Sequence, residues 1–184
     1  MIARGPGSYT VEDFDALPDT GPQYQLVDGE LMEMTVPTTW HQEFLWRLGA
    51  RMRLYVEERR LGRVLGAPIG VYLSQRDVFQ PDLFFLSSAR DERFEKKGII
   101  GAPELIVEVL SPSTRRLDLG RKRETYAMHG VHELWVADVE RETIAVYELQ
   151  KDPETPVRTL ARGDTLTTPL IPGFGAEVTM LFAR

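Results

Sequence analysis

Residues 103–111 read PELIVEVLS, and the apolar run inside this stretch is typical of a strand in the interior of a protein. One charged side chain, Glu108, interrupts the run. Burying a lone carboxylate is costly unless it is neutralised or paired. The faces of the strand follow from the alternation of side chains. One face carries Glu104, Ile106, Glu108 and Leu110, and the other carries Leu105, Val107 and Val109.

A second apolar stretch, QPDLFFL at residues 80–86, also contains one acid. Asp82 shares a face with Phe84 and Leu86. Pro81 has no N–H to donate to a neighbouring strand, so it is expected at the start or the edge of a strand. If the two strands are neighbours, the carboxylates of Asp82 and Glu108 converge. Two converging carboxylates repel each other unless a proton or a cation lies between them. Mg²⁺ takes oxygen ligands of this kind, often one or two carboxylates with water and substrate phosphate.

The segment LDLGRKRETYAMHG at residues 117–130 places Asp118, Lys122 and Tyr126 at i, i+4 and i+8, on one face of a predicted helix. The amine of Lys122 could serve the carboxylates. The alternative is a purely structural ion pair between Glu108 and Lys122 or an arginine. The arginines around Lys122 could receive phosphates or could form a solvated helix face. The basic cluster consists of Arg115, Arg116, Arg121, Lys122 and Arg123.

The remaining pattern mixes helices and strands. TVEDFDALP predicts a short helix, Asp28-Gly29 predicts a hairpin turn, and residues 39–60 predict a long amphipathic helix that starts with a capping box of Thr39 and Gln42. RVLGAPIGVYLS and DVFQPDLFFLS are each expected to form one strand. HELWVADVERETIAVYEL predicts a hairpin, and short strands follow it. This order predicts an α/β or α+β domain with a mixed sheet flanked by helices.

Composition excludes several classes of protein. The chain of 184 residues, 42% of them hydrophobic, suits a single domain spanning 1–184. It contains no cysteine, so disulfides and cysteine-based zinc sites are excluded. No apolar run suits a membrane span and the first residues lack a signal-like apolar segment, so we expect a cytoplasmic protein. The net charge of -6 argues against a globally basic nucleic-acid binder.

The order of these motifs carries a resemblance. A PD pair, an apolar strand with a glutamate and a following lysine resemble the PD-(D/E)XK nuclease superfamily. More closely, PDLFFL, PELIVEVLSPST, DLGRKRETYAMHGVHELWVAD and YQLVDGELMEM resemble the Uma-two family of restriction endonuclease-like proteins, over residues 10–180. The resemblance implies a restriction-endonuclease-like central mixed sheet flanked by helices, with an N-terminal β-hairpin and a long helix.

The resemblance also implies a metal site. Asp82, Glu108 and the backbone carbonyl of Val109 would bind Mg²⁺, with Mn²⁺ as a substitute. The superfamily lysine is expected two residues after the glutamate, where this chain has Leu110. In the Uma-two family the lysine comes from the following helix, which matches Lys122.

Two further positions match residues that line the site in the family, Glu30 and His41. Glu30 could equally be a surface acid, and His41 could equally be a residue of the helix start. Gln25 stands where many family members have an acid, which departs from the pattern and bears on metal affinity.

The expected function is metal-dependent hydrolysis of phosphodiester bonds in nucleic acid, with DNA as the substrate. Arg115, Arg116 and Arg121 would hold the nucleic-acid backbone through sequence-independent contacts. A homodimer is expected, because the chain shows no separate target-recognition domain. Two alternatives stay open: a catalytically silent binding or assembly module, and a phosphoesterase that acts on a substrate other than nucleic acid.

Overall fold

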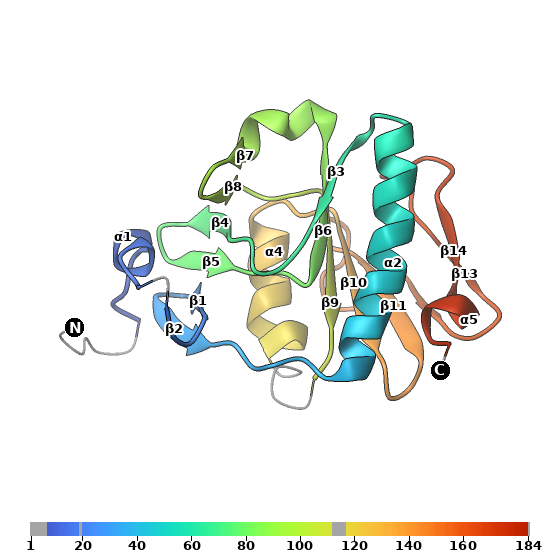
Figure 1. Cartoon of the computed structure of the whole chain (residues 1–184), viewed down its shortest axis with the longest axis horizontal. Coiled ribbons are helices and arrows are strands. Elements are labelled where there is room, and N and C mark those ends of the chain that lie inside the picture. Colours follow the sequence, from blue (N-terminus) through green and yellow to red (C-terminus); the bar gives the residue numbers. More distant parts are fainter. Residues whose placement is uncertain (1–6, 19, 112–116, 184) are drawn as a thin grey trace.

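The computed structural model describes residues 7–18, 20–111 and 117–183, and it has mixed α+β architecture (Figure 1). Two six-stranded mixed sheets and one two-stranded sheet are flanked by helices. The predicted fold class is therefore confirmed, although the strands divide between sheets. The helices are α1 (Val11–Asp15), α2 (Thr39–Glu58), the 3-10 helix η1 (Ser88–Arg93), the π-helix η2 (Asp118–Lys122), α4 (Arg123–Met128) and α5 (Val178–Leu181).

We call the sheet that contains PELIVEVLS the central sheet and the other six-stranded sheet the outer sheet. The central sheet has the order β12 (Arg158–Leu160), β11 (Thr143–Glu148), β10 (Glu133–Asp138), β9 (Leu105–Val109), β6 (Leu83–Ser87) and β3 (Gly62–Leu65). The outer sheet has the order β2 (Glu30–Glu33), β1 (Tyr24–Val27), β5 (Asp77–Phe79), β4 (Val71–Ser74), β8 (Gly98–Ile100) and β7 (Phe94–Glu95). The third sheet pairs β13 (Thr165–Thr167) with β14 (Gly175–Glu177).

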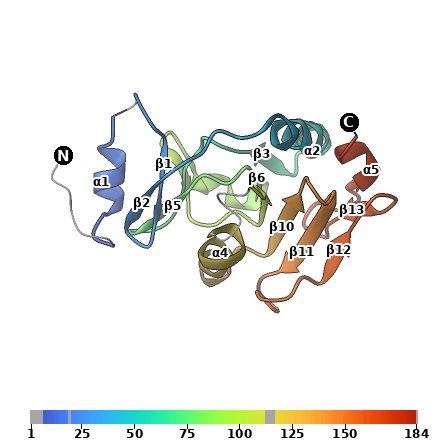
Figure 2. The same cartoon turned by 90° about the horizontal axis from the view of Figure 1, so that it is seen from below.

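Strand β9 lies in the middle of the central sheet, and all of its residues are buried. Leu105, Val107 and Val109 pack in one hydrophobic cluster with α2, and Ile106 belongs to the opposite cluster with Tyr126 of α4. The predicted alternation is confirmed. The two helices thus cover opposite faces of the central sheet (Figure 2).

The two stretches expected to form single strands each contain two strands, so this prediction was wrong. Between β3 and β4, and again between β5 and β6, the chain crosses from one six-stranded sheet to the other. The two crossings lie against each other. The N–H of Ala67 donates to the carbonyl of Pro81 at 2.9 Å, and a side chain at Gly66 would collide with the carbonyl oxygen of Asp82. The breaks in strand structure therefore bring Asp82 to the junction of both sheets.

The long helix begins at residue 39 as predicted, but its capping residue was predicted one position too late. The N-cap of α2 is Thr38, whose Oγ1 accepts a hydrogen bond from the N–H of His41 at 3.3 Å. Thr39 is the first helical residue. This cap fixes the first turn of α2, which carries His41 toward the central sheet.

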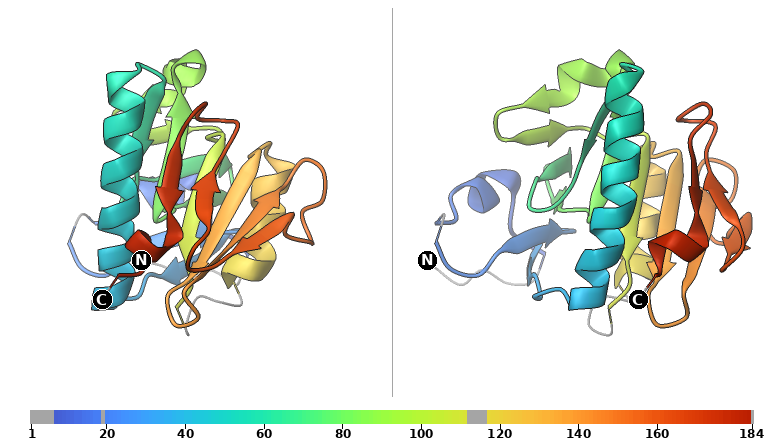
Figure 3. Two further views of the ribbon diagram at one scale, coloured as in Figure 1. Left: turned by 90° about the vertical axis from the view of Figure 1, so that its right-hand side faces the viewer. Right: turned by 45° about the vertical axis from the view of Figure 1, so that its right-hand side comes forward.

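Other local predictions are confirmed. Thr10 caps α1 through a reciprocal bond pattern with Asp13, and Asp28 and Gly29 form the tight turn of the β1–β2 hairpin with positive φ values of 47° and 73°. Residues 157–182, expected to form only strands, also contain α5. This helix and β13–β14 lie beside α2 over one face of the central sheet (Figure 3). Within the described ranges, no helix is long and apolar enough to span a membrane.

Candidate active site

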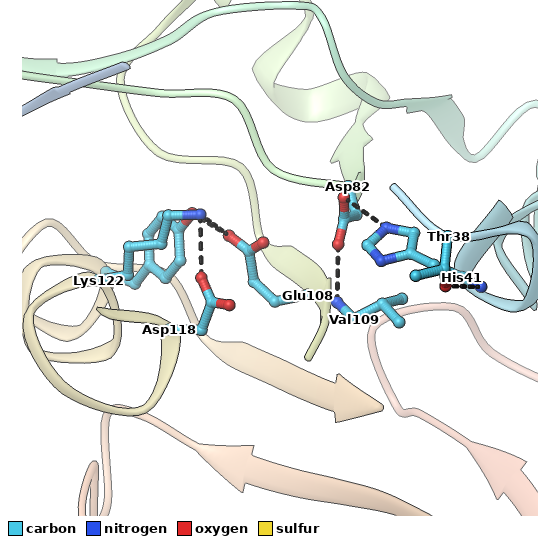
Figure 4. A network of polar contacts seen from close by, with 8 residues as sticks. Thr38, His41, Asp82, Glu108, Val109, Asp118 and Lys122 are labelled. Carbon is cyan, nitrogen blue, oxygen red and sulfur yellow. Dashed lines mark hydrogen bonds and ion pairs between the residues drawn. The ribbon is translucent and has the colours of Figure 1, made fainter. Parts of the chain in front are cut away.

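Asp82 and Glu108 come together because their strands are neighbours. Strand β6 pairs with β9 in antiparallel register, with Leu83 opposite Val107. Oδ2 of Asp82 accepts the N–H of Val109 at 2.7 Å, and Oδ1 lies 3.1 Å from Nε2 of His41 (Figure 4). Since an ionised carboxylate can only accept, Nε2 is the donor in this contact. The Asp82 carboxylate is therefore fixed by one group from β9 and one from α2.

The proline of the PD pair has a physical role in this arrangement. Extending the register by two residues places Pro81 opposite Val109. Proline has no N–H, so it supplies no ladder hydrogen bond to the carbonyl of Val109. The N–H of Val109 instead bonds to the Asp82 side chain. The carbonyl of Val109 therefore receives no ladder hydrogen bond from position 81.

Glu108 is contacted by side chains of the helical segment η2–α4, which follows β9 in the chain. Oε1 of Glu108 accepts hydrogen bonds from Nζ of Lys122 at 3.1 Å and from the hydroxyl of Tyr126 at 2.6 Å. Nζ of Lys122 also lies 3.1 Å from Oδ1 of Asp118. All four side chains are buried. The sequence spacing thus places three residues on one face toward Glu108, although the helix is kinked at Gly120.

Burial dominates the electrostatics of this cluster. Removal from water, only partly offset by Lys122, raises the pKa of Glu108 to about 8. Burial opposes the charge on Lys122, but the carboxylates of Glu108, Asp118 and Asp82 outweigh it, and the pKa of Lys122 is raised. Burial and Glu108 also raise the pKa of Tyr126 well above its ordinary value. Lys122 is therefore a cation at neutral pH, and Tyr126 is a neutral donor.

A pocket of about 1030 Å³ opens onto these groups. Its lining includes Asp82, Glu108, Val109, Asp118 and Lys122, with walls from α2, the β2–α2 connection and the Gly66–Pro68 crossing. Among the described residues, three buried side-chain atoms that line this pocket lack both a hydrogen-bond and an ion-pair partner: Oε1 of Gln25, Nδ1 of His41 and Oε1 of Gln80. Oδ1 of Asp118 has no hydrogen bond, but it is ion-paired with Nζ of Lys122 at 3.1 Å.

Buried polar atoms are normally bonded, so their concentration here indicates a pocket built for polar contents. Two of the three are oxygens, which suits a hydrated divalent cation. Among the residues described, no three His, Asp or Glu side chains are grouped as a complete metal site. Two carboxylates and a backbone carbonyl are nevertheless a donor set that fits Mg²⁺, which keeps several waters in its shell.

Other predicted site residues lie elsewhere. Glu30 forms a partly exposed ion pair with Arg121, at 3.3 Å, and neither residue is among those that line the pocket. Arg123 pairs with Glu154. Arg115 and Arg116 lie outside the described residues, so their expected role in phosphate binding stays a prediction.

Sequence reasoning assigned no site role to Gln80, and it placed Asp118 on the helix face of Lys122 without giving it a role in the site. The i, i+4 spacing to Lys122 was the available signal for Asp118. Gln80 offered only its position next to the PD pair. Gln25, noted as a departure from the family pattern, is buried with an unpaired amide oxygen at the pocket.

The mixed sheet, the PD pair at its edge and the facing glutamate and lysine define a restriction-endonuclease-like protein. The model of the Uma2 family, described as "Putative restriction endonuclease", matches residues 11–180, and the chain belongs to this family. A solved structure with the same fold is that of "a putative nuclease belonging to DUF820" from Anabaena variabilis. It has a TM-score of 0.79 and 20% identity, over 94% of this chain and 97% of that one. No curated protein matches the chain.

Proposed function

We propose that this protein is a Mg²⁺-dependent endonuclease that hydrolyses phosphodiester bonds of DNA, with Mn²⁺ able to replace Mg²⁺. The observation that carries the proposal is the convergence of Asp82, Glu108 and Lys122 on one pocket, which is also lined by buried polar atoms of Gln25, His41 and Gln80 without hydrogen-bond partners. Family membership supports the reaction class.

Asp82, Glu108 and the carbonyl of Val109 would hold the ion. When bound, Mg²⁺ would polarise a phosphoryl oxygen and make a water more acidic. His41 and the N–H of Val109 keep the Asp82 carboxylate in position, and Tyr126 does the same for Glu108. Because Lys122 is charged at neutral pH, its role is to orient water and stabilise negative charge on the phosphate, and not to accept a proton.

A second function class has one specific observation in its favour. Lys122 already neutralises Glu108, as it would in a purely structural ion pair. In that case the fold would serve as a binding or assembly module and would need no metal. Calorimetric titration with Mn²⁺ separates the two proposals before any substrate is chosen.

The test of the nuclease proposal is cleavage of plasmid and oligonucleotide DNA in Mg²⁺ or Mn²⁺. We expect Asp82→Asn, Glu108→Gln and Lys122→Ala each to lower the rate by about 100-fold or more. The first two should also weaken Mn²⁺ binding in calorimetry, because they replace ligands.

Matched controls are available on the surface. Asp91→Asn removes an exposed acid that pairs with Arg63, and Lys97→Ala removes an exposed amine that pairs with Asp15. Both should retain full activity. The proposal is wrong if purified protein cleaves no DNA in either metal, or if the site variants and the surface controls retain equal activity.

A further inference from the structure

Helix α2 forms one long wall of the pocket, and this wall carries an exposed tryptophan. Its lining residues recur at helical spacing, from Gln42 through Leu45, Trp46, Gly49 and Ala50 to Arg53. Trp46 is 74% exposed, although it lies next to the pocket. Gly49 and Ala50, the smallest residues on this face, follow Trp46 by about one turn.

Further apolar side chains line the pocket outside α2. The connection from β2 to α2 contributes Met34, Val36 and Pro37, and Val36 is 93% exposed. Pro68 of the first crossing lines the same pocket. A flat apolar group entering the pocket would cover the exposed indole of Trp46 in the same pocket that holds the carboxylates and the lysine.

The charges of the lining side chains limit which ligands this pocket can attract. Four carboxylates line the pocket, from Glu33, Asp82, Glu108 and Asp118, against the two cations Arg53 and Lys122. Lys122 is already paired with two of these acids. The pocket therefore does not attract a polyanion by charge alone, and contact with a nucleic acid must gain its free energy from apolar surface as well as from a bound cation.

We propose that Trp46 stacks on an unpaired nucleobase, so that the substrate is single-stranded or locally melted nucleic acid. In a duplex, both faces of each base are covered by neighbouring bases, and little apolar surface is left for this wall to cover. An unpaired base offers its π-face to an aromatic side chain in a sequence-tolerant way. The inference rests on the proposed nuclease function and adds the substrate class to it.

The experiment measures binding separately from cleavage. Fluorescence anisotropy follows a labelled single-stranded oligothymidylate, and a labelled duplex of matched length, in Ca²⁺, with oligonucleotide length checked on a gel. We expect wild type to bind the single strand at least tenfold more tightly than the duplex. Trp46→Ala should weaken single-strand binding by about tenfold, equivalent to about 1.4 kcal/mol, and Trp46→Phe should restore most of it.

Trp40→Ala is the matched control, because Trp40 lies on the same helix and is 44% exposed but does not line this pocket. This variant should bind like wild type. Calorimetry with Mn²⁺ should give the same affinity for Trp46→Ala and wild type, because Trp46 contacts the base and not the ion.

Three results would overturn the inference: equal affinity for single strand and duplex, unchanged single-strand binding in Trp46→Ala, or a loss in Trp40→Ala equal to that in Trp46→Ala. A shift from dimer to monomer in Trp46→Ala, without a change in oligonucleotide binding, would assign Trp46 to a contact between copies of the chain. The proposed function is tested separately from this inference. If the protein binds single strands through Trp46 but cleaves no DNA, only the proposed nuclease activity is wrong.

Discussion

Glu108 is the buried carboxylate on which the proposed metal site depends. Its Oε1 atom accepts hydrogen bonds from both Lys122 and Tyr126, and Figure 4 shows the carboxylate between Lys122 and Asp82. Removal from water penalises its charge, and the nearby carboxylates of Asp118 and Asp82 add to this penalty. A divalent cation would relieve the repulsion among these acids, which is a physical reason to expect metal binding here.

Stability of the metal-free protein should fall as pH rises from about 5 to 8. The folded-state pKa of Glu108, about 8, lies above the ordinary value of 4.5. Its stabilising contribution is therefore complete below pH 4.5 and is lost as pH rises through 8, with a slope of up to about 1.4 kcal/mol per pH unit. Urea denaturation in EDTA measures this slope. Glu108→Gln should flatten it, whereas Asp91→Asn should retain it; equal slopes in wild type and Glu108→Gln would contradict the prediction.

Removing the buried hydroxyl of Tyr126 should reduce the stability of the protein more than removing the exposed hydroxyl of Tyr55. Tyr126→Phe keeps the ring packed on Phe79 but removes a buried hydrogen bond to Glu108, and we expect a loss of about 1.5–3 kcal/mol. Tyr55→Phe removes an exposed hydrogen bond to the Pro172 carbonyl and should cost about 1 kcal/mol or less. Chemical denaturation at one pH compares the two variants. Equal losses would show that burial of the Tyr126 bond adds nothing.

The orientation of individual side chains was predictable where local periodicity determines the face of the strand or helix on which they lie. Alternation along β9 placed Glu108 on the correct face, and helical spacing grouped Lys122 with Tyr126. The pairing of Glu30 with Arg121 was not predictable, because it depends on where the β1–β2 hairpin lies relative to the helix after β9. No local pattern reports such a tertiary distance.

At the scale of the element, the start of α2 can be tested directly. Thr38→Ala should destabilise the protein by about 1 kcal/mol, because it removes the side-chain oxygen that accepts the N–H of His41. Thr39→Ala is the matched control and should change stability by less than about 0.5 kcal/mol. Thermal or urea denaturation distinguishes the two. A larger loss for Thr39→Ala would support the capping box that sequence alone predicted.

Strand boundaries were harder to predict than strand existence. The stretches at 63–74 and 77–87 have strand-like composition throughout, yet each divides between two sheets. The signals for division were Gly66 with Pro68, and Gln80 with Pro81, and neither pair states which sheet the next strand joins. The adjacency of β6 and β9, on which the candidate site depends, follows from that choice and not from either strand's sequence.

At the scale of the whole molecule, negative charge should make nucleic-acid binding depend on a divalent ion. The chain carries a net charge of -6, and the pocket lining adds no excess of cations. We expect EDTA to weaken oligonucleotide binding by about tenfold or more, and added Ca²⁺ to restore it. Fluorescence anisotropy with and without the ion measures the effect, and Lys97→Ala should respond as wild type does. Equal binding in EDTA and Ca²⁺ would rule out this dependence.

The expected homodimer also belongs to this scale and stays a prediction. Sedimentation at several protein concentrations would determine the assembly state. Single-domain organisation likewise stays as predicted from length and composition.

Because the chain crosses twice between the sheets, the proposed reactive groups and part of the pocket lining belong to different sheets. The acids and amine that would act on a phosphate are anchored to the central sheet and the helix behind it, whereas Gln25 and Met32, which also line the pocket, belong to the outer sheet. Substitutions in the outer sheet can therefore remodel what the pocket admits while the reactive groups keep their supports. Selectivity and chemistry can evolve on separate scaffolds within one short chain.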